Sequence, residues 1–134
     1  MIKDFRDLEV YQLANKLTVE VYKFVETLPN KERYCLIDQL IRASSSIGAN
    51  IAEGFGRYHT KEYLRFLYIA RGSLMEVLHF LVLSSELDYL DQKLFNKFEQ
   101  EINVMGVKLN NLIAALAKRQ APKSPQKLQQ VTAT

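Results

Sequence analysis

The sequence predicts an all-α protein, an antiparallel up-down-up-down four-helix bundle. Apolar residues recur at spacings of three and four through four long segments, the period of a helix with one buried face. The 134 residues include only 5 Gly and 3 Pro, which is few for a fold rich in strands or loops. The links between the segments are short, about 2–6 residues, so consecutive helices should be antiparallel neighbours.

The first helix is expected over residues 4–28. Asp7 is a candidate N-cap, and Pro29 ends the segment because proline cannot continue a helix. The expected core stripe is Leu13, Leu17, Val21, Phe24 and Leu28. The first helix should therefore turn one apolar face toward the rest of the bundle.

The second helix is expected over residues 31–54, with Asn30 as its N-cap. Gly54 and Gly56 should end it, because glycine tolerates the left-handed conformation common at helix ends. Its core stripe is Leu36, Leu40, Ala43, Ile47 and Ile51.

The third helix should follow Thr60 and run to about residue 87, and the fourth should follow Asp91 and run to about residue 118. Both preceding residues are favourable N-caps. The expected core stripes are Tyr63, Phe66, Ala70, Ser73, Leu74, Val77 and Leu81 in the third helix, and Leu94, Phe98, Ile102, Met105, Leu109, Leu112 and Leu116 in the fourth.

The bundle should therefore occupy residues 1–118, with a flexible basic tail over residues 119–134. Four of the 18 basic residues lie from position 118 onward, with no acid among them: Lys118, Arg119, Lys123 and Lys127. The rest of the chain holds 14 basic and 15 acidic residues, so the net charge of +3 comes from this C-terminal region. The tail has too few large apolar side chains to order itself.

The cysteine count and the apolar runs favour a cytoplasmic protein without membrane contact. A lone cysteine, Cys35, excludes an internal disulfide framework and suits a reducing compartment. The first residues mix charges of both signs and lack the apolar run of a secretory signal. No unbroken run of about 18 apolar residues is present.

The second and third helices are more apolar than a lone bundle needs. The third has apolar side chains nearly all round it, and the second carries another stripe beside its core stripe: Ile37, Ile41, Ser45, Gly48 and Ala52. Either these helices are central in the fold, or their outer faces bind another subunit. Because an extended apolar surface usually marks an interface, we expect self-association.

A carboxylate near the negative pole of the second helix needs a compensating partner. Glu53 is in the last turn, where the helix dipole disfavours it. Either Arg57, four residues on, or Arg42, about three turns back, could supply the positive charge. We expect Arg42, Asn50 and Glu53 to form a structural polar group that joins helices or subunits.

Several runs resemble the ribosomal-RNA intervening-sequence protein family, whose members are often called four-helix-bundle proteins. The most specific are Asn-Ile-Ala-Glu-Gly at 50–54 and Phe-Leu-Tyr-Ile-Ala-Arg-Gly-Ser at 66–73. The resemblance is strong over about residues 4–90. It departs from the family pattern at Tyr11, where Trp is common, and at Gly48, where Pro is common.

The resemblance implies a bundle that assembles as a ring, a pentamer, without catalytic residues or a cofactor. Family members are encoded inside insertions in large-subunit ribosomal RNA genes. Related proteins, the accessory variability determinants of diversity-generating retroelements, act as accessory subunits of reverse transcriptases and bind nucleic acid. The residues assigned to structure and interface are Arg42, Ser45, Gly48, Asn50, Glu53, Gly54 and Gly72.

A basic cluster after the second helix is the candidate nucleic-acid site. The expected contact residues are Arg57, Tyr58, Lys61, Arg65, Lys118 and Arg119. Cationic side chains would meet phosphates, and Tyr58 could stack on a base. The plainer interpretation is a solvated face in which the arginines pair with Glu53 and Glu62. The partner of the ring would then be RNA or DNA, with a reverse transcriptase as a further candidate.

Other constellations favour structural interpretations. Glu76 and His79 have the spacing of a di-iron bundle ligand pair, but His59, the other histidine, has no glutamate three residues before it. We therefore expect no metal. The serine run at 44–46 lacks a nucleophile elbow, and Cys35 lacks an activating base. We expect no enzyme. The rival function is a protein-binding adaptor that does not contact nucleic acid.

Overall fold

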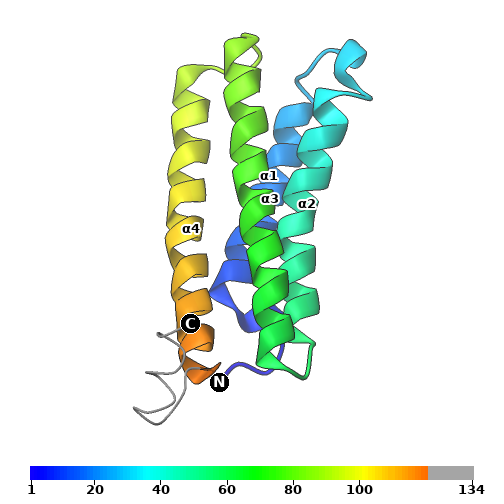
Figure 1. The fold of residues 1–134 in the computed structure, drawn as a ribbon. Helices are drawn as coiled ribbons and strands as arrows, with labels where there is room; N and C mark the ends of the chain where they lie inside the picture. Colours follow the sequence, from blue (N-terminus) through cyan, green and yellow to red (C-terminus); the bar gives the residue numbers. More distant parts are fainter. Residues whose placement is uncertain (121–134) are drawn as a thin grey trace, which may run out of the picture.

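A computed structural model of the protein describes residues 1–120 and contains a bundle of four long helices. The helices are α1 (Glu9–Val25), α2 (Leu36–Phe55), α3 (Thr60–Glu86) and α4 (Gln92–Gln120), and two single-turn 3-10 helices, η1 (Phe5–Asp7) and η2 (Asn30–Glu32), precede α1 and α2. Consecutive helices run side by side in opposite directions (Figure 1). The predicted all-α bundle is confirmed.

The core contains most of the expected stripes. The largest fully buried side chains include Leu17, Leu40, Ile47, Ile51, Leu67, Leu74, Ile102 and Leu109. In α4 the expected stripe drifts, because Ile113 is buried whereas Leu112 is only half-buried. Every helix contributes to this single apolar cluster, so its burial holds the four helices together.

The starts of the first two helices differ from the expectation. Asp4, and not Asp7, is the N-cap residue of η1, and the Asp7 side chain closes a capping box behind it. Asn30 begins η2, so α2 starts at Leu36, after Cys35. Short 3-10 turns therefore replace the first turns of two expected helices.

The later boundaries match more closely. The carboxylate of Asp91 accepts a hydrogen bond from the backbone N–H of Leu94 at 2.8 Å, which confirms the expected cap of α4. Thr60 is the first residue of α3, with His59 in the cap position. α4 continues to Gln120, two residues beyond the expected bundle boundary. The expected flexible tail lies otherwise outside the described residues.

The four seams of the bundle differ in closeness. α2 and α3 pack most tightly, and α1 and α4 have the fewest contacts. A Cβ atom at Gly54 would lie 2.9 Å from the Cβ of Phe66 and 3.2 Å from the carbonyl oxygen of Tyr63. The glycine is therefore required by the close approach of α2 to the first turns of α3. Over residues 1–120 no glycine has a positive φ, so the prediction of a left-handed glycine at the end of α2 is wrong.

One helix of the described residues, α3, is long and apolar enough to cross a membrane by length and composition. The sequence expectation considered only unbroken apolar runs, and α3 carries isolated charges within its apolar stretch. Core helices pass the same test, and α3 buries Leu67, Leu74, Val77 and Leu81 against its neighbours.

Candidate nucleic-acid interface

The turn between α2 and α3 positions the candidate cationic side chains. Arg57 follows the end of α2, Lys61 lies in the first turn of α3, and Arg65 lies one turn later. Because residues 61 and 65 are four apart in a helix, they share one face. All three side chains are exposed. The fold therefore brings the expected cluster together at the turn.

Two carboxylates hold the arginines of this cluster. Arg57 pairs with Glu53 at 2.8 Å, and Arg65 pairs with Glu62 at 3.6 Å. The guanidinium groups of both arginines also lie near the ring of Phe66, 4.9 and 5.1 Å from its centroid. The ion pairs with Glu53 and Glu62 that the plainer interpretation predicts are thus present in the structure. The arginine positions are defined, and their charges are partly neutralised.

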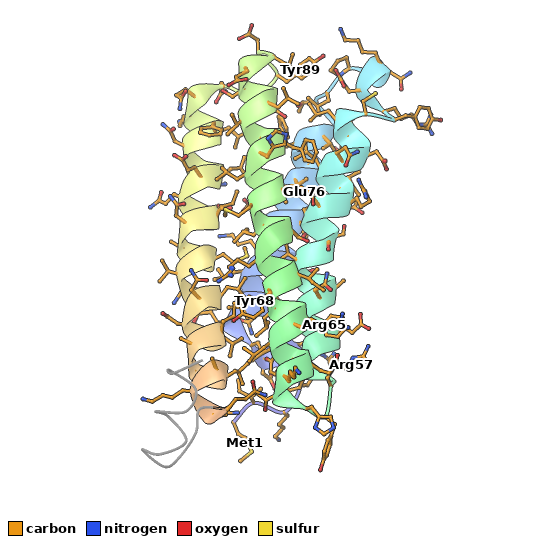
Figure 2. All side chains as sticks on the ribbon, viewed as in Figure 1. Met1, Arg57, Arg65, Tyr68, Glu76 and Tyr89 are labelled. Atoms are coloured by element: carbon orange, nitrogen blue, oxygen red, sulfur yellow. The ribbon has the colours of Figure 1, made fainter. Side chains whose placement is uncertain are left out.

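The end of α4 lies beside the same turn. Burial raises the pKa of Tyr63, near the start of α3, and the positive charge of Arg119 opposes that rise. Arg119 is therefore close to the first turn of α3. Arg57 and Arg65 lie at the end of the bundle that also holds Met1, with Tyr89 at the opposite end (Figure 2).

We call this surface the basic end and define it by Arg57, Tyr58, Lys61, Arg65, Lys118 and Arg119. The sequence separated these residues into a cluster and a tail, whereas the fold places them at one end of the molecule. The basic end thus holds five cationic side chains, and two carboxylates pair with its arginines Arg57 and Arg65. The remaining positive charge could attract phosphate groups.

Tyr58 is the most exposed aromatic side chain of the basic end, with 95% of its surface accessible. His59 meets its ring edge-on, with centroids 5.0 Å apart and planes at 88°. An apolar ring in water costs free energy unless a partner covers it. The ring is therefore available to a flat partner.

The polar group expected from Arg42, Asn50 and Glu53 does not form within the chain. Arg42 donates to the side-chain oxygen of Gln39. Asn50 donates to the backbone oxygen of Ser46 at 2.8 Å, and Glu53 pairs with Arg57. Of the two partners expected for Glu53, Arg57 is the one that binds it. Within the chain each of the three residues therefore has a separate partner.

The small residues of α2 mostly serve contacts inside the chain. A Cβ atom at Gly48 would lie 3.5 Å from the ring of Tyr11, so this glycine gives space to α1. Ser45 is exposed beside it. Gly72, on α3, is different, because a Cβ atom there would meet nothing within 4 Å. Among the expected interface residues, Gly72 offers an open approach.

The serine run and the other polar residues have structural roles or lie exposed. Ser44 is buried and donates to the carbonyl oxygen of Ile41, and the hydroxyl of Ser73 donates to that of Ser46 at 2.9 Å. Cys35 is exposed. Glu76 and His79 both lie exposed on α3.

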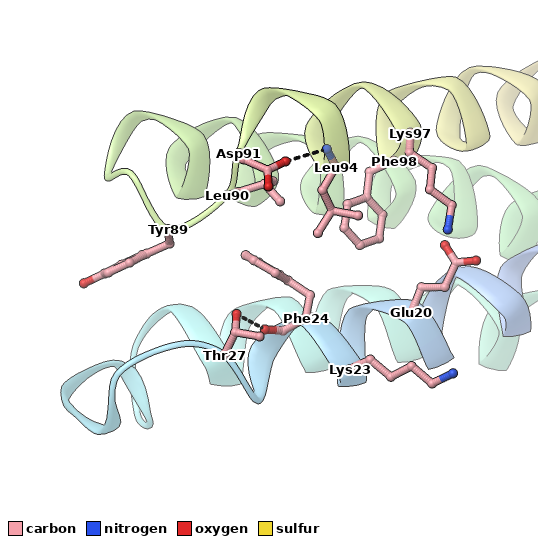
Figure 3. Close-up of a pocket in the computed structure, with 10 residues that line it drawn as sticks. All are labelled: Glu20, Lys23, Phe24, Thr27, Tyr89, Leu90, Asp91, Leu94, Lys97 and Phe98. Carbon is pink, nitrogen blue, oxygen red and sulfur yellow. Dashed lines mark hydrogen bonds between the residues drawn. The ribbon is translucent and has the colours of Figure 1, made fainter.

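A feature that sequence reasoning missed lies along the seam between α1 and α4. A cavity of about 400 Å³ has a floor of Phe24, Leu94 and Phe98, with Glu20 and Lys97 at its edge (Figure 3). Two smaller cavities, of about 240 and 280 Å³, follow along the same seam. The separate periodicities of two helices could not reveal this, because the cavities depend on how far apart the helices pack.

Two carboxyl groups meet across this seam. Partial burial raises the pKa of Glu101 to about 7, and its hydrogen bond to Glu20 adds to the rise. Lys16 and Lys97 oppose the rise with their positive charges. The two glutamates therefore favour a state in which one of them carries a proton near neutral pH.

Comparisons with known proteins agree with this fold. Residues 6–111 match the model of the 23S rRNA-intervening sequence protein family. A crystal structure of a protein with unknown function from the S23 ribosomal protein family of Bacteroides thetaiotaomicron is similar, with a TM-score of 0.72 and 21% identity. The match covers 78% of this chain and 97% of that one, and it shows a shared fold. No curated protein matches the chain.

Proposed function

Because the chain belongs to the 23S rRNA-intervening sequence protein family, we propose that it is a non-catalytic accessory or scaffold protein associated with nucleic acid. In this proposal it works in the cytoplasm as a homo-oligomer, a pentameric ring. The observation that carries the proposal is the basic end, where the α2–α3 turn and the last turn of α4 place five cationic side chains and an exposed tyrosine at one end of the bundle.

Electrostatics supports the nucleic-acid part of the proposal. Phosphate contacts by lysine and arginine provide affinity that does not depend on base sequence and that weakens as salt rises. In a ring, each protomer would repeat its basic end around the axis, so weak contacts would add through multivalency. The setting of such a contact is either an insertion in a ribosomal RNA gene or the complex of a reverse transcriptase.

The outer faces of α3 and α4 support self-assembly. Both expose large apolar side chains: Tyr68, Ile69, Met75 and Val82 on α3, and Val104 and Val107 on α4. Gly72 lies between Tyr68 and Met75, where its open surroundings let another backbone approach closely. A surface of this kind is typical of subunit contacts.

A protein-binding adaptor is the second candidate function, and the α1–α4 seam favours it. The cavity over Phe24, Leu94 and Phe98 has the apolar floor and charged edge of a pocket for a partner's side chain. In this case the ring would hold a partner protein without touching nucleic acid.

Two measurements test the proposal. Light scattering should give a mass well above a dimer, near five times the 15.5 kDa of one chain. A monomer at micromolar concentration would contradict the ring. Fluorescence anisotropy with labelled RNA and DNA at low salt should show binding, and its absence for both would leave the adaptor as the better candidate.

A further inference from the structure

Tyr58 combines three properties that together suit contact with a nucleotide base. It is 95% exposed, it lies in the short turn between two packed helices, and the edge-on contact with His59 supports its ring. The helices on both sides are held by the close approach at Gly54. The ring is therefore displayed on a firm base, which lowers the ordering cost of contact with a partner.

The cations beside Tyr58 are placed for the phosphates of a strand that runs past it. Arg57 is next to Tyr58 in the chain, and its pairing with Glu53 fixes its direction. Lys61 is exposed in the first turn of α3. A strand that stacks one base on Tyr58 would therefore carry its neighbouring phosphates close to positive charge.

We propose that Tyr58 is a stacking platform for an unpaired base, so that the basic end selects single-stranded over double-stranded nucleic acid. The inference rests on the proposed association with nucleic acid and names the form of the ligand. Bases in a duplex are already stacked on their neighbours, and exposing one has an energetic cost. A single strand offers its base faces directly, and stacking on an aromatic ring tolerates any base.

The opposite end of the bundle provides a matched control. Tyr34 is 81% exposed and lies beside Arg33, whose guanidinium is 5.4 Å from the ring centroid. The two tyrosines thus share exposure and an adjacent arginine. Only Tyr58 belongs to the basic end. If exposure alone governed contact with RNA, both tyrosines would respond equally to it, whereas the proposal predicts a response at Tyr58 alone.

The test uses the absence of tryptophan from the chain. Tyr58→Trp and Tyr34→Trp each introduce a single fluorescent reporter. The probe is a mixed-sequence RNA of about 12 nucleotides, long enough for one site, alone or annealed to its complement. The single strand should quench the fluorescence of Tyr58→Trp strongly and leave that of Tyr34→Trp nearly unchanged.

Affinity measurements on full-length variants complete the test. Tyr58→Ala should weaken single-strand binding about tenfold, as expected for the loss of one stacked base, with duplex binding nearly unchanged. Tyr58→Phe should retain single-strand affinity. Unquenched Tyr58→Trp despite binding, or equal losses for both forms of RNA, would overturn the stacking proposal alone. No binding of either form to the unmodified protein would overturn the proposed function and this inference with it.

Discussion

The two ends of the bundle carry similar residues and differ in what surrounds them. Each displays an exposed tyrosine next to an arginine, Tyr58 at the basic end and Tyr34 at the other. At the other end the carboxylate of Glu32 accepts a hydrogen bond from Tyr89 at 3.0 Å, and Asp91 caps α4. Carboxylates at that end therefore accept from a tyrosine hydroxyl and from a helix N-terminus.

The difference shows how a fold makes a site from ordinary residues. At the basic end, the α2–α3 turn and the last turn of α4 contribute cations, while Glu53 and Glu62 neutralise only part of the charge. At the other end, the hydrogen bond from Tyr89 to Glu32 joins the α3–α4 turn to the α1–α2 turn. Each prediction below changes one side of this comparison.

The largest effect should follow from disturbing the support of the basic end. Gly54→Ala places a Cβ atom 2.9 Å from that of Phe66 and should lower the free energy of unfolding by about 2–4 kcal/mol. Gly106→Ala, where a Cβ atom would lie 3.9 Å from the side chain of Leu74, should change stability by less than about 1 kcal/mol. Urea denaturation measures both, and equal effects would show that the α2–α3 approach is looser than described.

Truncation after Leu116 measures how much the end of α4 contributes to RNA binding at the basic end. It removes Lys118 and Arg119 together with Lys123 and Lys127, while the buried Leu116 is kept. RNA affinity at low salt should fall by about 10- to 100-fold, and the salt dependence should become shallower, because fewer counterions are released. Light scattering should show unchanged assembly. An unaltered salt dependence would place the phosphate contacts elsewhere.

The carboxyl pair of the α1–α4 seam lies away from both ends and should control stability rather than binding. Folding raises the pKa of Glu101 from 4.5 to about 7, so the folded chain keeps a proton that the unfolded chain loses in this range. The free energy of unfolding should therefore fall as pH rises from 4.5 through 7. Because Glu101 is only partly buried, solvent screening limits the effect to about 1 kcal/mol.

Denaturation of Glu101→Gln over the same pH range tests this assignment. The substitution should remove most of the decline, since glutamine stays neutral and keeps a hydrogen-bonding group. Glu86→Gln, an exposed change at the end of α3, should leave the decline in place. A decline that persists in Glu101→Gln would assign it to other groups.

The smallest effect should come from Glu53. Its side chain is 53% exposed and its partner Arg57 is 45% exposed. Glu53→Ala should therefore lower the stability of the single chain by less than about 0.5 kcal/mol, the size typical of a surface ion pair. Buried polar partners, as the sequence alone led us to expect, would give about 1–3 kcal/mol. A loss of that larger size, accompanied by weaker assembly, would indicate that Glu53 is buried between subunits.

The helices and their core could be predicted from sequence because apolar periodicity is a local property. The start of α2 could not, because Asn30 is a good cap and only the wider fold shows that it begins a 3-10 turn. The cations of the turn were found from their spacing. The approach of Arg119 to Tyr63 at the start of α3, and the pairing of Glu101 with Glu20, depend on contacts between distant helices, which no local pattern records.

The most direct test of the basic end compares charge reversal at the two ends. Lys61→Glu with Arg119→Glu changes the basic end, and Lys31→Glu with Lys93→Glu changes the other by the same net charge. Anisotropy titration of labelled RNA at low salt should show at least about a tenfold loss for the first pair and less than about a twofold loss for the second. Equal losses would mean that only net charge matters and would contradict a nucleic-acid interface at the basic end.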